Sequence, residues 1–336
     1  MVYEGIHMPI APSLDHGSLV VLVPVYNDWE SLWLLIKNLN QIASQTSIEF
    51  SVMVVDDGST YAPPTQSNLE QVIGNIKLIE IIHLHTNLGH QRAIAVGLSE
   101  IFHRHAYDYV VVMDADGEDK PIDVIQLIQA NKETPKSIIV AQRAKRSEGV
   151  SFRTFYRLYK LTFRILVGKD LDYGNFCLIP KFHIGRLVFN PMVWNHLAAS
   201  VSRSGLSIVK LRTERGDRYY GTSRMKFERL ISHGMSAISV YLDTVMIRIL
   251  ISSSLIMVLT CIGVLAVVGL RFFTDLAIPG WATTAVGLLS VLGLQALILS
   301  TFASFVILKD RSGIAVLPAV DASKYINWVE RIFGDE

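Results

Sequence analysis

The sequence predicts an α/β domain followed by an α-helical transmembrane hairpin, and three observations support this fold class. Over residues 1–240, short apolar runs rich in β-branched residues alternate with longer helical patterns, an order typical of α/β proteins. Charged residues make up 18% of the 336-residue chain, but only Arg271 and Asp275 are charged within residues 249–308. The mean hydropathy of +0.35 therefore arises from one region of the chain.

The α/β part is predicted from five strands and three helices. The strands are apolar runs of the kind buried on both faces of a parallel sheet: Leu19–Pro24, Phe50–Val55, Ile76–Leu84, Tyr109–Met113 and Ser137–Ala141. Between them lie helical patterns at Trp29–Ala43, Gln91–His105 and Pro121–Lys132. Ligands of open α/β sheets bind at the carboxyl ends of the strands, so the residues that follow each strand are the first functional candidates.

The transmembrane hairpin is predicted from two uncharged segments, Ile249–Leu270 and Ala282–Leu308, each longer than the ~20 residues that cross a bilayer core. This length argues against two buried helices of a globular protein. Lys and Arg residues flank the pair on both outer sides, while the connecting segment holds only Arg271. By the positive-inside rule, both termini and the soluble domain face the cytoplasm, which predicts a multi-pass protein of the inner (cytoplasmic) membrane.

The predicted organisation has five parts. They are an N-terminal extension without a signal-peptide pattern (1–17), the soluble domain (18–230), a juxtamembrane helix (231–248), the two membrane helices (249–270 and 282–308) and a cytoplasmic C-terminal tail (309–336). A net charge of +1 argues against nucleic acid as a partner. Cys177 and Cys261 lie far apart, which argues against a disulfide framework. Two membrane helices leave room for a homo-oligomer.

Acidic or polar turns follow three of the predicted strands: Pro24–Asp28, Asp56–Thr60 and Asp114–Asp119. Asp114 and Asp116, separated by one residue, can both reach one hard divalent cation and leave positions for diphosphate oxygens. The chain has neither a GxxxxGK[ST] motif nor a GxGxxG motif after a strand. The pattern therefore favours a metal-bridged nucleotide diphosphate over kinase-type or dinucleotide chemistry.

The order of these motifs resembles the family 2 glycosyltransferases with the GT-A (nucleotide-diphospho-sugar transferase) Rossmann-like fold. Over residues 18–230 the chain has PVYN, VDDGST, NLGHQRAIAVG, the DxD turn DADGED and a YGNF segment. The apolar hairpin after RYYGTSRMKFERL makes it most similar to the polyprenyl-phosphate glycosyltransferases, relatives of dolichol-phosphate mannose synthase. It departs from the pattern at Glu118, where Gln is common, and at Tyr61, where Asp is common. The QxxRW motif of processive synthases is absent from the sequence.

The resemblance implies site residues and partners. The donor would be a nucleotide-diphosphate sugar, with Pro24, Tyr26, Asp56 and Asp57 near the nucleotide and Arg92 facing it. Mg²⁺ or Mn²⁺ would be held by Asp114 and Asp116, with Glu118 as a further candidate ligand. Within the segment that begins at residue 87, we expect no catalytic role for His90, and a plain loop and helix start accounts for that segment equally well.

A basic, aromatic amphipathic helix is predicted near residues 152–167, where Arg153, Arg157, Lys160 and Arg164 recur at helical spacing. Such a helix is typical of contact with a lipid bilayer, and a solvated basic face packed on the domain is the alternative. The resemblance implies that arginines of this region bind the phosphate of a lipid. The candidates are Arg143, Arg153, Arg157, Arg218 and Arg224, and with Asp114 and Asp116 we count Arg143 among the catalytic candidates.

Residues 173–213 contain no Asp or Glu, although inverting GT-A enzymes that act on sugar hydroxyls usually present a carboxylate base in this stretch. A hydroxyl acceptor must lose a proton, whereas a phosphate acceptor is already an anion. We therefore expect transfer of one sugar, with inversion, to polyprenyl (undecaprenyl) phosphate. The alternatives are a glycosyltransferase acting on a hydroxyl of another membrane acceptor, with Asp172, Glu118, Asp119 or Glu214 as base, and a non-catalytic nucleotide-sugar or lipid-binding protein.

Overall fold

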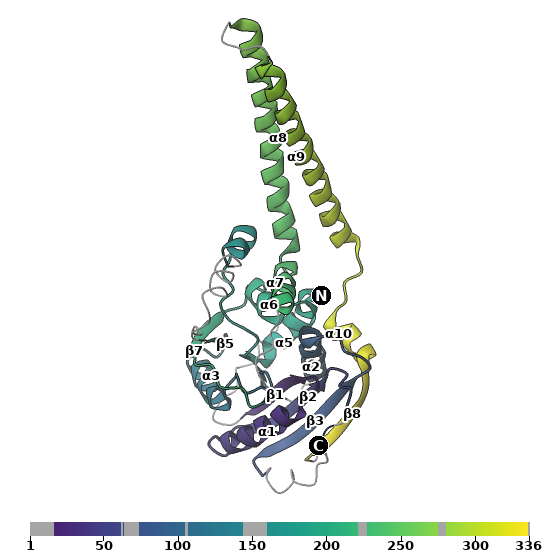
Figure 1. The fold of residues 1–336 in the computed structure, drawn as a ribbon. Helices are drawn as coiled ribbons and strands as arrows, with labels where there is room; N and C mark the ends of the chain where they lie inside the picture. Colours follow the sequence, from purple (N-terminus) through teal and green to yellow (C-terminus); the bar gives the residue numbers. More distant parts are fainter. Residues whose placement is uncertain are drawn as a thin grey trace, which may run out of the picture. The chain divides into compact units, whose positions relative to one another are not determined.

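The computed structural model describes residues 17–61, 63, 74–104, 107–143, 160–220, 227–274 and 280–334 (Figure 1). The chain divides into two compact units. The first unit contains residues 1–149, 171–240 and 315–336, and the second contains residues 150–170 and 241–314.

The first unit is built on an eight-stranded mixed sheet with the strand order β7-β5-β6-β4-β1-β2-β3-β8. The strands are β1 (Ser18–Val25), β2 (Glu49–Asp56), β3 (Ile76–Leu84), β4 (Tyr109–Val112), β5 (Ile138–Arg143), β6 (Cys177–Pro180), β7 (Ile208–Thr213) and β8 (Ile326–Phe333). Strand β1 pairs in parallel with β2 and β4, β2 with β3, and β5 with β7. Strand β6 runs antiparallel to β4 and β5, and β8 runs antiparallel to β3.

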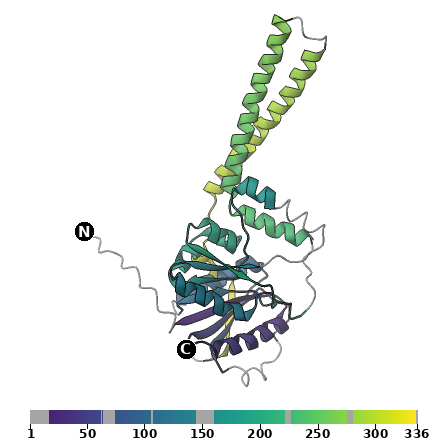
Figure 2. The same ribbon diagram turned by 90° about the vertical axis from the view of Figure 1, so that its left-hand side faces the viewer.

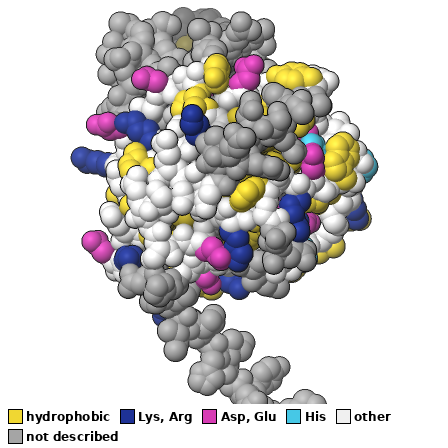
Figure 3. All heavy atoms as spheres, turned by 90° about the horizontal axis from the view of Figure 1, so that it is seen from below, with side chains coloured by type: hydrophobic (Ala, Val, Ile, Leu, Met, Phe, Trp, Pro, Cys, Tyr) yellow, Lys and Arg dark blue, Asp and Glu magenta, His cyan; other side chains and the backbone are white. Residues whose placement is uncertain are grey.

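Helices cover both faces of this sheet (Figure 2). One apolar core includes residues of α1 (Trp29–Ala43) and α3 (Pro121–Glu133), and the other includes residues of α2 (His90–Arg104), α5 (Lys181–Val188) and α6 (Leu197–Arg203). Helix α2 lies so close to the sheet that a Cβ atom on Gly97 would come within 2.2 Å of Leu22 Cδ1. In the view of Figure 3, Lys and Arg side chains are interspersed with Asp and Glu side chains, as the near-zero net charge leads one to expect.

The predicted strands and helices of the α/β part are confirmed, and the sheet has three further strands, β6, β7 and β8. The ranges of β3 and α1 match the predictions to the residue, and β1, β2, β4 and β5 differ only at their ends. The sheet is mixed instead of wholly parallel, because β6 and β8 join it in the opposite direction. Strands β6 and β7 were not predicted; β6 has four residues, and β7 is largely half-buried and therefore lacks a continuous apolar run.

The expectation of a separate C-terminal tail at residues 309–336 is corrected by the structure. Strand β8 is part of the sheet of the first unit, where it lies along the outer side of β3 (Figure 1). The cross-strand partners include His83 with Trp328 and Ile81 with Glu330. Helix α10 (Pro318–Asp321) and the 3₁₀ helix η2 (Ala322–Tyr325) precede β8, and Ser99 of α2 donates a hydrogen bond to the Pro318 carbonyl (2.8 Å). The soluble domain is therefore assembled from both sides of the apolar hairpin.

The second unit contains two long apolar helices, α8 (Leu242–Phe273) and α9 (Trp281–Ser312), which run side by side (Figure 2). Both are long and apolar enough to cross a membrane, and most of their residues are not buried. The expected juxtamembrane helix 231–248 is divided: α7 (Phe227–Ser239) ends before Val240, whereas residues 242–248 are the first two turns of α8. Within this unit residues 160–167 are helical; the rest of the predicted amphipathic helix, including Arg153 and Arg157, lies outside the described residues.

Candidate active site

The carboxyl ends of β1 and β4 frame the candidate site. Strand β1 continues to Val25, beyond its last β4 pair, Leu22 with Val112. Pro24 lies in this unpaired part of the β1 and β4 ladder, so its lack of an N–H costs no hydrogen bond to β4. These two strands are parallel neighbours, and the chain continues from β1 to β2 and β3 on one side of the pair and from β4 to β5, β6 and β7 on the other. Open α/β sheets bind ligands at such a switch point.

The DxD turn after β4 is folded tightly by its own carboxylates. The Asp114 amide donates to Asp119 Oδ2 (3.0 Å), and the Glu118 amide donates to Asp116 Oδ1 (3.0 Å). Gly117, between them, has φ +87°, a backbone conformation in which glycine is favoured. Four carboxyl groups are thereby gathered within six residues.

Arg143, the last residue of β5, reaches three of these carboxyl groups. Its Nη2 lies 2.5 Å from Asp119 Oδ1 and 3.7 Å from Asp114 Oδ2, and its Nη1 lies 3.5 Å from Glu118 Oε2. Asp119 is buried, with 2% exposure. Arg143 therefore joins the end of β5 to the DxD turn.

A second group of cations comes from the segment that follows β7. Arg218 Nη2 lies 2.6 Å from Asp116 Oδ2, and Arg215 pairs with Glu118. The same segment also bonds through its backbone, because the Gly216 amide donates to the Glu118 carbonyl and the Tyr219 amide to the Asp116 carbonyl (both 2.9 Å). The sequence analysis named Arg218 but missed Arg215, whose only signal was its position in the motif RGDR.

The crossing of this segment over the DxD turn requires glycine on both sides. A Cβ atom on Gly216 would come within 2.3 Å of the Gly117 carbonyl oxygen, and one on Gly117 would come within 2.9 Å of the Tyr219 ring. The Tyr219 hydroxyl accepts a hydrogen bond from Asn38 Nδ2 of α1 (2.9 Å), which fixes the far side of the ring. The relative position of arginines and carboxylates is therefore set by backbone contact as well as by charge.

The electrostatics of the turn reflect crowding of like charges. Burial, followed by the neighbouring charge of Asp114, raises the pKa of Asp116, and Arg218 opposes that rise. Burial raises the pKa of Asp119 to about 7, against the opposing effect of Arg143. Although burial disfavours the charged guanidinium, the three carboxylates around Arg143 raise its pKa. Cations supplied by the chain thus compensate part of the negative charge of the turn.

His90, the first residue of α2, also lies at the DxD turn. Its Nε2 is 3.2 Å from Asp114 Oδ1 and 3.2 Å from Asn175 Nδ2 of the YGNF segment. Desolvation lowers the pKa of His90, but the carboxylates of Asp114, Asp57 and Asp116 raise it by more. The sequence analysis gave His90 no catalytic role, since a lone histidine carries no motif that indicates its neighbours.

The two acidic residues after β2 hold turns in place. Asp57 accepts hydrogen bonds from the amides of Leu88 (2.7 Å) and Gly89 (2.9 Å), so it fixes the loop after β3. Asp56 accepts a hydrogen bond from the Ser59 amide (2.9 Å) and contacts His83 Nδ1 (2.9 Å). Both are buried, and burial raises the pKa of Asp57.

The first and second motifs are tied together at Asn27, which has φ +53°, a strained conformation for a residue other than glycine. Its side chain accepts from the Thr60 amide (2.9 Å), its own amide donates to Ser59 Oγ (3.0 Å), and its carbonyl accepts from the Tyr61 hydroxyl (2.6 Å). These bonds hold the neighbouring Tyr26, whose side chain is 48% exposed, at the open end of β1.

The remaining predicted residues are more dispersed. Arg92 is exposed at the start of α2, where its backbone amide donates to the Gly89 carbonyl (3.0 Å). Arg224, like Arg153 and Arg157, lies outside the described residues. Of the predicted phosphate-binding arginines that the structure describes, Arg143 and Arg218 meet at the DxD turn, from β5 and from the segment after β7.

The oxygen ligands of this turn fit a hard divalent cation. Asp114 and Asp116 supply carboxylates, and Mg²⁺ is commonly held by one or two carboxylates together with substrate phosphates and water. Among the described residues, no group of three or more His, Cys, Asp and Glu side chains is arranged to hold a metal ion. Glu118, the third expected ligand, is engaged by Arg215 and Arg143. The arrangement thus suits a cation shared with a diphosphate better than one held by protein side chains alone.

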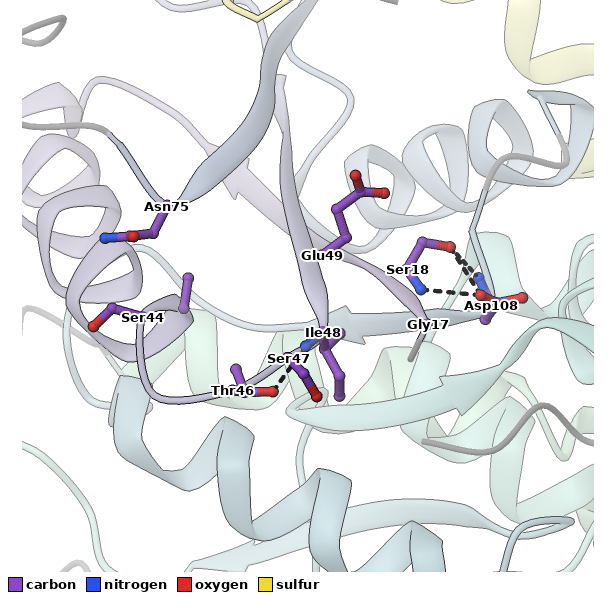
Figure 4. A pocket seen from close by; sticks show the side chains of 10 residues that line it. Gly17, Ser18, Ser44, Thr46, Ser47, Ile48, Glu49, Asn75 and Asp108 are labelled. Atoms are coloured by element: carbon purple, nitrogen blue, oxygen red, sulfur yellow. Dashed lines mark hydrogen bonds between the residues drawn. The ribbon is translucent and has the colours of Figure 1, made fainter. Parts of the chain in front are cut away.

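A shallow cavity of about 700 Å³ lies at the other edge of the sheet. It is lined by residues at the amino ends of β1, β2, β3 and β4, among them Ser18, Glu49, Asn75 and Asp108 (Figure 4). Asp108 is occupied there as a structural acceptor, bound by the amide (2.9 Å) and hydroxyl (3.0 Å) of Ser18. Since functional residues of open α/β sheets gather at the carboxyl ends, this cavity is not the candidate active site.

Comparison with known proteins agrees with this geometry. The model of the family described as glycosyl transferase family 2 matches residues 20–189, which contain β1, β2 and the DxD turn. The chain belongs to glycosyl transferase family 2. The expected GT-A fold, the expected enzyme class and the resemblance to polyprenyl-phosphate glycosyltransferases are confirmed.

Several individual proteins are similar to this glycosyltransferase. YkcC of Bacillus subtilis (strain 168), named an uncharacterized glycosyltransferase, is 25% identical over 309 residues, 87% of this chain and 89% of that protein. The undecaprenyl-phosphate 4-deoxy-4-formamido-L-arabinose transferase of Pectobacterium carotovorum subsp. carotovorum is 26% identical over 269 residues, 77% of this chain and 78% of that protein. Among solved structures, glucosyl-3-phosphoglycerate synthase from Mycobacterium tuberculosis matches with a TM-score of 0.48 and 13% identity, covering 68% of this chain and 80% of that chain.

Proposed function

We propose that this family 2 glycosyltransferase moves a single sugar from a nucleotide-diphosphate sugar to polyprenyl phosphate at the cytoplasmic face of the inner membrane. The observation that carries the proposal is the meeting of Arg143, Arg215 and Arg218 at the DxD turn. Guanidinium groups bind phosphate oxygens in a bidentate manner, and here they lie beside the carboxylates assigned to the donor diphosphate. A relative named undecaprenyl-phosphate 4-deoxy-4-formamido-L-arabinose transferase supports the same acceptor class.

The carboxylates near the site favour a phosphate acceptor over a hydroxyl acceptor. Each of the four acids that could serve as a general base is paired with a cation: Glu118 with Arg215, Asp119 with Arg143, Asp172 with Lys210 (2.7 Å) and Glu214 with Lys120 (3.0 Å). Asp172 also accepts a hydrogen bond from Gln142 (2.6 Å). A phosphate oxygen is already an anion and requires no such base.

The topology of the chain supports the placement of both ends of the hairpin on the same side of the membrane. Residues 171–240 and 315–336 belong to the same folded unit, so the chain that enters α8 and the chain that leaves α9 must both connect to the catalytic sheet. If α8 and α9 both span the membrane, the unit stays on one side of it. The basic residues that flank the hairpin support the cytoplasm as that side.

In the proposed reaction an oxygen of the lipid phosphate attacks the anomeric carbon, and the bond from that carbon to the donor diphosphate breaks with inversion. The electron pair leaves with the nucleoside diphosphate, and no proton is transferred. Asp114 and Asp116 would hold Mg²⁺ or Mn²⁺, which would supply positive charge opposite the leaving diphosphate. Arg143 and Arg218 hold the attacking phosphate in line and reduce its repulsion from the donor. Asp57 and Asn27 keep the nucleotide-facing turns in place through the hydrogen bonds described above.

The decisive experiment offers the purified protein a panel of UDP- and GDP-sugars with Mg²⁺ or Mn²⁺. Undecaprenyl phosphate, undecaprenol and a lipid-linked saccharide are supplied as parallel acceptors. We expect a glycosylated product only with undecaprenyl phosphate. Transfer to the alcohol or to the saccharide hydroxyl would favour the hydroxyl-acceptor alternative, and absence of both transfer and donor hydrolysis would favour a non-catalytic binding protein.

A further inference from the structure

Resting on the proposed function, we propose that His83 is a positioning residue of the donor site, held in place by strand β8 from beyond the apolar hairpin. His83 neither touches the DxD turn nor belongs to any motif of the sequence analysis. It links three strands: Asp56 of β2, its own strand β3, and Trp328 and Glu330 of β8. The C-terminal strand would thereby act on donor binding through the sheet.

The contacts of His83 occupy both nitrogens and one ring face. Its Nδ1 lies 2.9 Å from Asp56 Oδ2, and its Nε2 lies 3.2 Å from Glu330 Oε2. The imidazole stacks on the Trp328 indole, with ring centroids 4.4 Å apart and an interplanar angle of 22°. His83 is 5% exposed and Asp56 is 6% exposed. A buried imidazole with an acceptor at each nitrogen is a donor at both positions, which is the imidazolium form.

The contact passes from His83 into the nucleotide-facing turns. Asp56 uses its second oxygen to accept the Ser59 amide (2.9 Å), so the orientation of its carboxylate sets the turn that contains Asp57 and Gly58. Ser59 in turn accepts the amide of the strained Asn27 (3.0 Å), next to Tyr26. Each step is a hydrogen bond, and the first joins two buried side chains. Displacing the His83 ring therefore displaces the turns that face the donor nucleotide.

The charges around His83 determine the pH range in which it contacts Asp56 and Glu330. Burial lowers the pKa of His83, but the hydrogen bonds and charges of Asp56 and Glu330 raise it above its ordinary value. Asp56 faces it from β2 and Glu330 from β8; helix α1, on the same sheet face, carries its charged residues Glu30 and Lys37 exposed. A group with a raised pKa in the folded protein is protonated at low pH and loses its proton as pH rises through that folded pKa. The contact of His83 with Asp56 and Glu330 therefore weakens as the pH rises above this pKa.

The test measures binding of UDP and of GDP, each with Mn²⁺, to the full-length protein in detergent between pH 5.5 and about pH 9, the range in which a histidine can titrate. The variants are His83→Gln and Glu330→Gln, with Glu49→Gln as matched control. Glu49 loses the same charge at the amino end of β2, where it pairs with Lys77 (2.9 Å). Thermal unfolding at each pH reports whether a variant remains folded.

We expect wild-type affinity for the binding nucleotide to fall as pH rises through the titration of His83. In Glu330→Gln this fall moves to lower pH, in Glu49→Gln it stays in place, and His83→Gln binds about tenfold more weakly and lacks this step of the profile. Superimposable profiles for wild type and Glu330→Gln would overturn the inference while leaving the proposed function intact. Failure of wild type to bind either nucleotide would overturn the proposed function and this inference together.

Discussion

The two units of this protein use the same residue types in opposite ways. In the first unit the large apolar side chains are buried: Leu19, Leu22, Phe50 and Ile81 are 0% exposed. In the second unit they lie outside: Leu265 is 71% exposed and Phe305 is 66% exposed. Apart from Val245, the buried positions of α8 and α9 are taken by small or hydroxylated residues: Ser253, Thr260, Ala296, Ser300 and Ala303. The exposed apolar side chains of the hairpin suit an apolar solvent such as a lipid bilayer, whereas the sheet buries its apolar side chains in a core within the protein.

The two units also differ in their polar contacts. The catalytic unit concentrates ion pairs at one edge of its sheet, where seven side chains of the DxD turn, β5 and the segment after β7 interlock. In the hairpin, the side chains of Ser253 and Ser300 form a hydrogen bond between the two helices (2.7 Å). We therefore expect single substitutions to act strongly on chemistry in the first unit and weakly on stability in the second.

The largest effect is expected from Asp116→Asn, which should lower turnover at least about a hundredfold because it removes a carboxylate assigned to the metal and diphosphate. Folding should persist, since neutralising this group also relieves repulsion from Asp114. EDTA should have the same effect on wild type in a product assay. Asp108→Asn, at the opposite sheet edge, is the control and should retain turnover. Full activity in EDTA would remove the metal from the mechanism.

Gly216→Ala should come next, with a loss on the order of a hundredfold in kcat/KM, because a Cβ atom there would collide with the Gly117 carbonyl and shift Arg215 and Arg218 from the turn. The matched control is Gly74→Ala, where a Cβ would meet nothing within 4 Å. Steady-state kinetics measures the activity of both variants, and circular dichroism reports whether each remains folded. Equal, small losses in both variants would show that the crossing of backbones does not position the arginines.

A smaller, selective effect is expected from replacing Arg153 and Arg157 together with Gln, which keeps side-chain length and removes charge. If this region binds the lipid phosphate, KM for undecaprenyl phosphate should rise about thirtyfold while the donor Kd stays within about twofold, since each of the two cations near an anionic surface contributes about 1 kcal/mol. Titrating each substrate separately checks this. Parallel losses for both substrates would instead indicate that the helix supports the fold.

The smallest effect is expected in the hairpin. Ser300→Ala removes the hydrogen bond to Ser253 and should destabilise the pairing of α8 and α9 by about 0.6 kcal/mol, with turnover unchanged. Ser304→Ala is the control, because Ser304 bonds only within its own helix, to the Ser300 carbonyl (2.9 Å). Unfolding in mixed micelles measures both. A large loss of turnover in Ser300→Ala would contradict the separation of roles drawn between the two units.

Local sequence predicted the parts of the fold whose signals are local. The helix at Trp29–Ala43 and the strand at Ile76–Leu84 were placed to the residue, because a long periodic stripe and a nine-residue apolar run leave little ambiguity. Strand β8 was missed because the segment INWVERIF is half-exposed and its partner β3 lies some 240 positions earlier in the chain. No periodicity within β8 indicates that partner.

The site residues that belong to sequence motifs were predicted, and those that become neighbours only through the fold were missed. Asp114, Asp116, Arg143 and Arg218 converge as expected, although they come from different elements. The placement of Asp56 near the nucleotide did not anticipate its contact with His83, since the pairing of β2 with β3 alone brings the two side chains together. Likewise, His90 and Arg215 carry no pattern of their own and depend on the packing of α2 and of the segment after β7.

The position of β8 has a consequence for how the protein is made. A ribosome completes α8 and α9 before it synthesises residues 326–333, so the edge of β3 waits unpaired while the hairpin emerges. At translation rates of about 5–20 residues per second, the residues between β3 and β8 take roughly 10 to 50 seconds to synthesise, long compared with helix formation. The catalytic sheet therefore receives its last strand only after its anchor exists, and a chain terminated early lacks both the strand and the His83 contact. Completion of the enzyme is thus timed to follow the synthesis of its membrane segment.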